Sequence, residues 1–153
     1  MNAHKELNIQ IMDARQAPPR IDTLGLDAAL ILNLMTQFDH FGLWRKDIET
    51  SLTHWSPDVF RIFGWPWREG PVDSREVIEM YHPEDRALVL DCISEAVSRK
   101  TGFWFVLRLR MPDGSWKFIQ SNARYRVSEE GREELVGTVC EIKERVRSAT
   151  VYP

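Results

Sequence analysis

The chain has 153 residues, of which 43% are hydrophobic and 28% charged, and its formal net charge is −3. This length and composition suit one globular domain around a single hydrophobic core. The nearly balanced charge provides no long-range attraction to nucleic acid or to an anionic membrane surface, so we expect neither as a partner.

The first segment, residues 1–22, is predicted to be a flexible arm, because Pro18 and Pro19 would interrupt any helix. Apolar residues then recur at helical spacing and predict an amphipathic helix over residues 23–38. Leu30 and Leu34 widen its apolar stripe beyond one face. These two leucines are therefore candidates for an interface with another surface.

The middle of the chain predicts two strands followed by three helices. The strands cover residues 42–48 and 52–55, and a short helix then begins at Ser56-Pro57 and ends at Gly64. A loop separates it from a helix over residues 74–80, and the longest helix runs from His82-Pro83 to about residue 99. His82 is expected to fix the start of this helix rather than to act in catalysis.

Three strands close the sequence, over residues 103–111, 116–127 and 135–142, and residues 141–147 are predicted to begin a short exit helix. A run of strands around a helical insertion is typical of an α+β fold, with helices covering one face of an antiparallel sheet.

Alternation along the first of these strands separates its side chains into two sets. The inward set should meet side chains from the helices and form either a closed core or a ligand pocket, with Gln120 or Asn122 as a polar anchor. The pocket candidates are Phe60, Ile62, Phe63, Met80, Leu88, Phe103, Phe105, Leu107, Leu109 and Gln120. The outward set begins with Trp104 and Val106, an apolar pair on a face expected to contact solvent, and we predict an interface there.

Several short motifs occur in a recognisable order. They are Trp44 with Asp47, Trp55-Ser56-Pro57, Arg61-Ile62-Phe63-Gly64, His82-Pro83-Glu84-Asp85-Arg86, Arg110-Met111-Pro112-Asp113-Gly114, Gly137-Thr138, and Ile142 with Glu144-Arg145. Together they resemble the PAS family over about residues 38–146. The resemblance implies a five-stranded antiparallel sheet with helices over one face, and a domain over residues 39–147 between the N-terminal helix and a tail, 148–153.

The resemblance also implies a sensory or regulatory role in signal transduction. We expect protein–protein interaction, with a homodimer and with a signalling protein such as a histidine kinase or another regulator as partner. The alternative is a sensor of a small metabolite or of haem that uses the space between the sheet and the long helix.

The sequence carries no pattern that predicts catalysis or a metal site. It has no phosphate-binding glycine loop, no nucleophile elbow and no Cys/His spacing that suits zinc. The two cysteines, Cys92 and Cys140, form no CxxC pair and match no flavin-reactive motif. With no signal peptide and no apolar run long enough to span a bilayer, the expectation is a cytoplasmic protein that is not an enzyme.

Overall fold

A computed structural model describes residues 7–9 and 23–153 of the chain. Contacts divide the chain into two units, residues 1–34 and 35–153. Most of the predicted arm, residues 1–22, lies outside the described residues. Within the described part, no helix is both long enough and apolar enough to cross a bilayer.

Helix α1 spans Ala28–Thr36, which is shorter than the predicted range 23–38. Gly25 has a φ of 66°, in the left-handed region, so the residues before Asp27 cannot belong to the helix. The Asp27 carboxylate accepts the N–H of Leu30 at 2.7 Å and begins the helix instead. None of the residues of α1 is buried.

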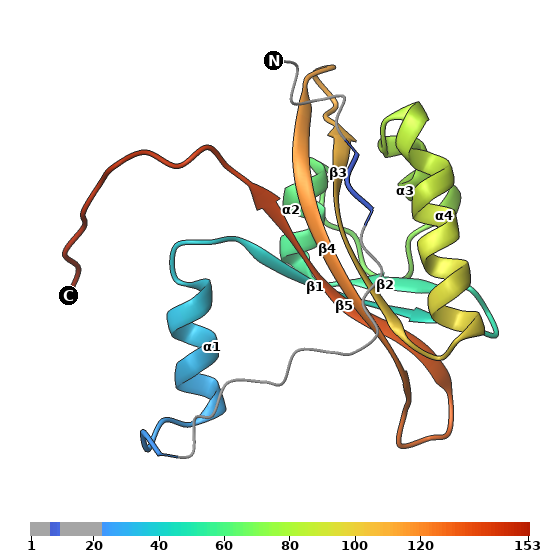
Figure 1. Cartoon of the computed structure of the whole chain (residues 1–153), viewed down its shortest axis with the longest axis horizontal. Coiled ribbons are helices and arrows are strands. Elements are labelled where there is room, and N and C mark those ends of the chain that lie inside the picture. The colour runs from blue at the N-terminus through green and yellow to red at the C-terminus, as the bar shows by residue number, and fades with distance from the viewer. Residues whose placement is uncertain (1–6, 10–22) are drawn as a thin grey trace. The chain divides into compact units, whose positions relative to one another are not determined.

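Five strands form one sheet, as the sequence predicts (Figure 1). The strands are β1 (Phe41–Asp47), β2 (Thr53–Trp55), β3 (Gly102–Arg110), β4 (Trp116–Val127) and β5 (Glu133–Ile142). Their order is β2-β1-β5-β4-β3, and every neighbouring pair is antiparallel. The first strand of the domain therefore pairs with the last, in the middle of the sheet.

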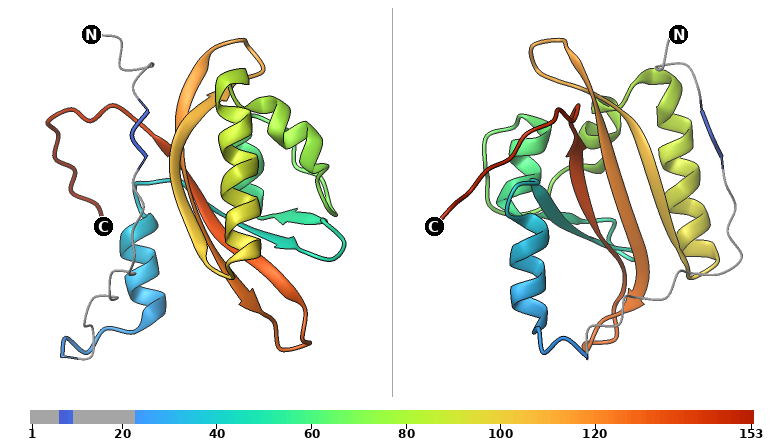
Figure 2. Two further views of the ribbon diagram at one scale, coloured as in Figure 1. Left: turned by 45° about the vertical axis from the view of Figure 1, so that its right-hand side comes forward. Right: turned by 60° about the vertical axis from the view of Figure 1, so that its left-hand side comes forward.

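Three helices complete the domain: α2 (Pro57–Phe63), α3 (Ser74–Met80) and α4 (Pro83–Ser98). As predicted, α2 has Pro57 in its first turn and ends at Gly64, whose φ of 71° terminates the helix. His82 fixes the start of α4, as expected, because its Nδ1 accepts the N–H of Glu84 at 3.1 Å and caps the helix. Helices α3 and α4 lie on the same side of the sheet (Figure 2).

The hydrophobic core lies between this helical layer and the inner face of the sheet. Alternation along β3 is as predicted, with Phe105, Leu107 and Leu109 buried and Trp104 exposed on the other face. Four residues of α2 are also buried: Val59, Phe60, Ile62 and Phe63. Burial of these side chains is the main favourable contribution to folding.

The predicted exit helix over residues 141–147 is wrong. Strand β5 continues to Ile142, which pairs with Phe118 of β4, and no helix follows in residues 143–153. Pairing with the long neighbouring strand supplies backbone hydrogen bonds to the part of the predicted helix that lies in β5, Glu141 and Ile142.

Candidate functional site

A cavity of about 80 Å³ lies between the inner face of the sheet and the three helices of the domain. Its wall is mostly apolar and aromatic, with a few hydroxyl groups and one lysine. The lining residues are Trp44, Lys46, Thr53, Trp55, Val59, Phe63, Ser74, Val77, Ile78, Tyr81, Val89, Ile93, Phe103, Phe105, Ser121 and Val139. All five strands and all three helices of the domain therefore contribute side chains to the cavity wall.

Three of the predicted pocket residues line this cavity: Phe63, Phe103 and Phe105. Four others are fully packed in the core, namely Phe60, Ile62, Leu107 and Leu109. Two more, Met80 and Leu88, are partly buried and pack against that core. The structure does not bring these six residues to the cavity wall.

Gln120 does not reach the cavity either. It lies in β4 between Ile119 and Ser121, two residues that are buried on the inner face. Since side chains alternate along a strand, Gln120 lies on the opposite face, in register with Val106 and Cys140. It is therefore not placed to anchor a ligand in the cavity.

Three polar side chains of the cavity wall lie next to one another, and we call these three, Lys46, Thr53 and Ser74, the polar mouth. The Nζ of Lys46 donates to the Oγ of Ser74 at 3.2 Å. The Oγ1 of Thr53 lies 3.4 Å from the same Ser74 oxygen. Three side chains from three separate elements thus present donors side by side.

The backbone explains how the polar mouth forms. Lys46 of β1 and Thr53 of β2 are directly paired across the hairpin. Thr53 also makes an isolated bridge to Val72, with the Val72 N–H donating to the Thr53 carbonyl at 2.8 Å. That bridge brings the start of α3, and with it Ser74, to the end of the hairpin.

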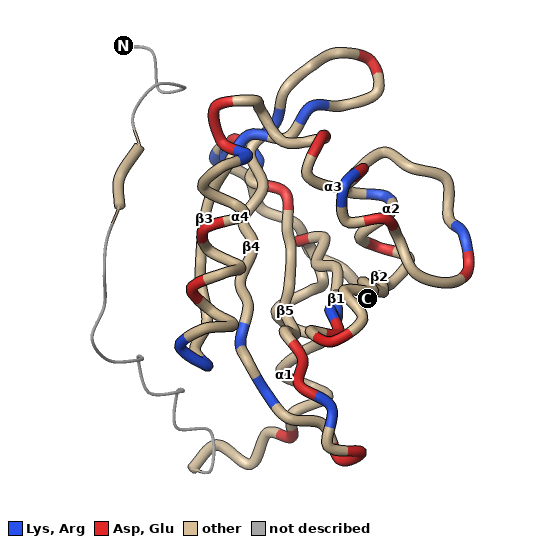
Figure 3. Tube along the Cα trace, turned by 90° about the vertical axis from the view of Figure 1, so that its right-hand side faces the viewer, with Lys and Arg blue, Asp and Glu red and all other residues tan. Residues whose placement is uncertain are grey.

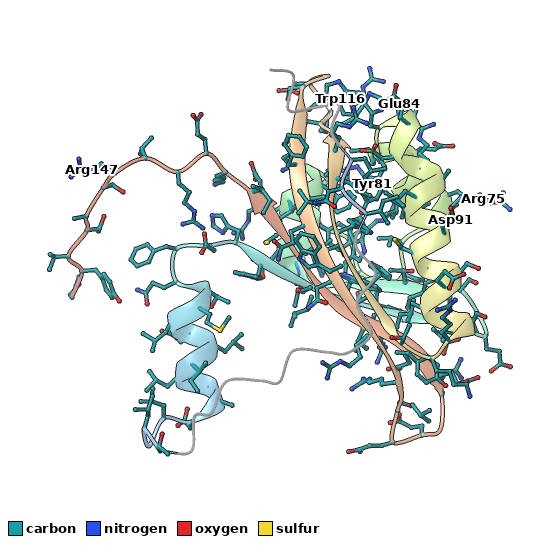
Figure 4. The ribbon with its side chains drawn as sticks, viewed as in Figure 1. Arg75, Tyr81, Glu84, Asp91, Trp116 and Arg147 are labelled. Carbon is teal, nitrogen blue, oxygen red and sulfur yellow. The ribbon has the colours of Figure 1, made fainter. Side chains whose placement is uncertain are left out.

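Burial changes the protonation behaviour of two residues in the cavity wall. Desolvation lowers the pKa of Lys46, because the ammonium form loses hydration there. Desolvation raises the pKa of Tyr81 well above its usual range, so its phenol stays protonated at neutral pH. Tyr81 lies between the sheet and α4 (Figure 4), and its ring meets those of Phe63 and Phe105 edge to face.

Sequence reasoning missed the polar mouth. The available signal was alternation in β1, where Gly42, Trp44 and Lys46 share the inner face of the sheet. A lysine that shares a strand face with a tryptophan of the core is unusual, because lysine is rarely buried without a partner. Ser74 carried no comparable signal, since its position depends on a contact between distant segments.

The outer face of the sheet carries the predicted interface pair on β3. Trp104 is 61% exposed and Val106 is half-buried. Leu43 of β1 lies on the same face, and it is exposed. Ile142 of β5 is exposed there too, and we call Leu43, Trp104, Val106 and Ile142 the outer apolar face. In α1, the other predicted pair, Leu30 and Leu34, is exposed as well.

Charged residues of both signs are interspersed along the described chain rather than gathered on one face (Figure 3). Over residues 7–9 and 23–153, no group of three or more His, Cys, Asp or Glu side chains is placed to hold a metal ion. Cys92 and Cys140 are both free thiols, and burial raises the pKa of each.

The family model described as the PAS fold matches residues 52–139. No curated protein gives a significant match to the sequence.

Solved structures with the same fold come from several organisms. A sensory box histidine kinase/response regulator from Burkholderia thailandensis has a TM-score of 0.59 and 22% identity, over 72% of this chain and 83% of that one. The N-terminal domain of a diguanylate cyclase with a PAS/PAC sensor from Marinobacter aquaeolei has a TM-score of 0.58 and 18% identity, over 66% and 94%. A PAS domain from Colwellia psychrerythraea has a TM-score of 0.56 and 16% identity, over 76% and 99%.

These structural likenesses concern the fold, which is the one that the sequence motifs predict. The family match covers more than half of the chain and includes the Trp55-Ser56-Pro57 and His82–Arg86 motifs. The chain belongs to the PAS fold family.

Proposed function

We propose that this PAS domain is a regulatory module of signal transduction that acts through protein–protein contact and forms a homodimer. The observation that carries the proposal is the outer apolar face, in which Trp104 is 61% exposed on the face of the sheet opposite α3 and α4. Exposed apolar patches of this kind usually mark contact surfaces. Tryptophan is also enriched among the residues that dominate binding energy at interfaces.

A second copy of the chain is the occupant we favour for this face. Helix α1 exposes apolar residues on several sides, among them Leu30, Leu32, Leu34 and Met35, and buries none of its residues. A lone helix in water rarely carries apolar side chains all round. We therefore infer that α1 of one copy packs on the outer apolar face of the other, which would remove both apolar surfaces from water.

Sedimentation velocity of the full chain tests the homodimer directly. The wild type should sediment as a dimer at micromolar concentration, and Trp104→Thr should shift it to monomer. Trp67→Thr is the matched control, since Trp67 is equally exposed at 61% but lies in the loop between α2 and α3. A monomeric wild type, or a dimer that survives both Trp104→Thr and Leu34→Glu, would refute the arrangement.

The partner in signalling is proposed to be a histidine kinase or a comparable regulator. Support comes from the fold, which the chain shares with sensor domains of a histidine kinase/response regulator and of a diguanylate cyclase. A photo-crosslinking amino acid at position 104 in the native cell should form adducts with a signalling protein, and the same group at position 67 should not. If the only adducts are with a second copy of the chain, the homodimer is supported and the proposal of a separate signalling partner is refuted.

Small-molecule sensing is the second candidate function, and the cavity with its polar mouth favours it. The volume of about 80 Å³ is well below the roughly 300–1,000 Å³ typical of sites for drug-sized ligands. Haem is larger than most such ligands, so the cavity suits a much smaller molecule. Occupancy of the cavity would stiffen the sheet that carries the outer apolar face, which offers a route from ligand to partner.

A further inference from the structure

Lys46 is a half-buried cation without an acidic partner among the described residues. Its Nζ contacts the Ser74 hydroxyl, and desolvation alone accounts for its lowered pKa. The other inward-facing lysine of the sheet, Lys117, differs in this respect, because it pairs with Glu141 at 3.3 Å. A partly buried charge that lacks a counter-ion is costly. An anion beside Lys46 would remove that cost.

The neighbours of Lys46 suit an anion as well. The hydroxyls of Ser74 and Thr53 lie 3.4 Å apart, and that of Ser74 donates to the Ser51 carbonyl at 3.4 Å. A hydroxyl can rotate, so an added anion beside Lys46 could take either proton instead. Tyr81 also lines the cavity, and burial raises its pKa, so its phenol stays protonated. One cation with a few neutral donors matches a single negative charge. A phosphate dianion would keep an uncompensated charge in a largely apolar site.

The remainder of the site sets the size and polarity of the ligand. Apart from the polar mouth, Tyr81 and Ser121, the wall consists of aromatic and aliphatic side chains, including Trp44, Trp55 and Phe103. The cavity of about 80 Å³ is roughly half of the ~150 Å³ that an engineered apolar cavity needs to hold benzene. An apolar group of about three carbon atoms is therefore the appropriate occupant.

We propose that the cavity binds a short-chain aliphatic monocarboxylate, with its carboxylate against Lys46, Ser74 and Thr53 and its hydrocarbon end between Trp44, Trp55 and Phe103. This inference rests on the second candidate function, small-molecule sensing. The specificity of the site follows from its two parts: the charge of Lys46 selects the carboxylate, and the volume of the cavity excludes longer chains.

Calorimetric titration of the full chain with sodium butyrate tests the proposal, alongside butyramide and inorganic phosphate. Butyrate should bind saturably and change the fluorescence of the tryptophans that line the cavity. Butyramide, which has the same shape without the charge, should bind about tenfold more weakly or worse, because hydrogen bonds to charged groups are the stronger ones. Phosphate should neither bind in the cavity nor displace butyrate.

Two variants locate the binding. Lys46→Met keeps the length of the side chain without its charge, and it should weaken butyrate about tenfold or more while it leaves butyramide within about twofold. Lys143→Met removes an exposed charge after β5 and should leave butyrate affinity unchanged. Circular dichroism of each variant verifies folding before titration.

Several results would overturn the inference: no saturable binding of butyrate by the wild type, equal affinity of butyrate for Lys46→Met, or displacement of butyrate by phosphate. None of these depends on the oligomeric state. Sedimentation of the same samples therefore tests the homodimer separately, and either proposal can fail while the other stands.

Discussion

Asp85 illustrates how one carboxylate fixes the position of a helix on the sheet. Its oxygens accept three hydrogen bonds from Arg108 of β3: from the backbone N–H at 3.1 Å, from Nε at 3.0 Å and from Nη2 at 2.7 Å. Both side chains are nearly buried. Burial alone would raise the pKa of Asp85, but the hydrogen bonds from Arg108 outweigh it and hold this pKa below its ordinary value.

Replacement of Asp85 by asparagine should strongly destabilise the domain. The variant leaves the nearly buried Arg108 guanidinium with only the exposed Glu84 carboxylate, at 3.2 Å, as a counter-ion. Loss of one partner of a buried pair costs about 3 kcal/mol or more. Urea denaturation at neutral pH measures the change. Asp91→Asn on the exposed side of α4 (Figure 4) is the control and should alter the free energy of unfolding by less than about 0.5 kcal/mol.

The stability that Asp85 contributes should depend on pH. Because folding lowers the pKa of Asp85, the unfolded chain takes up the proton at a higher pH than the folded one. The contribution is complete above the ordinary aspartate pKa of about 4 and declines as the pH falls through the lower pKa of the folded state. The difference in unfolding free energy between wild type and Asp85→Asn should therefore shrink from pH 7 to pH 3. A constant difference would contradict the assignment.

At the scale of elements, α4 depends on its first residues. His82 accepts the Glu84 N–H through Nδ1, and its ring lies 4.7 Å from that of Trp116, measured between centroids. The backbone N–H of His82 donates to the Arg108 carbonyl at 3.0 Å, which ties the start of α4 to the free edge of β3. One residue thus links the cap of the helix to the sheet.

His82→Ala removes the side-chain cap and should lower the free energy of unfolding by about 1 kcal/mol. His82→Asn supplies an alternative capping oxygen and should recover most of that loss. Thermal unfolding of the three proteins, with α4 followed by amide hydrogen exchange, provides the measurement. Equal destabilisation by alanine and asparagine would attribute the role of His82 to its contact with Trp116 instead.

Elements with strong local signals are predictable from the sequence. Pro57 and Gly64 bound α2, and strict alternation in β3 is enough to identify its buried face. In the mispredicted exit helix, Glu141 and Ile142 pair with β4 instead, and this pairing overrides local preference at those two positions. The polar mouth is not predictable from the sequence. Ser74 lies beside Lys46 because Val72 bridges to Thr53, and no periodic pattern of residues predicts that bridge.

At the scale of the whole molecule, association and folding are linked in the proposed homodimer. Anything that binds the folded state alone stabilises it by mass action, and a second copy of the chain is such a ligand. The urea midpoint of the wild type should therefore rise with protein concentration. Trp104→Thr should abolish that rise, while the Trp67→Thr control retains it. A midpoint independent of concentration in all three proteins would favour a monomer.

The pairing of β1 with β5 also governs how the domain responds to mechanical load. Phe41 lies opposite Cys140, and beyond them Arg145 pairs with Asp39 at 2.9 Å, so the two ends of the domain meet at one place in the sheet. A force that pulls the two ends apart would break the hydrogen bonds between β1 and β5 one after another. It would not load all of them at once, as a shearing force along the strands would. The domain should therefore yield at low force, starting with the ion pair.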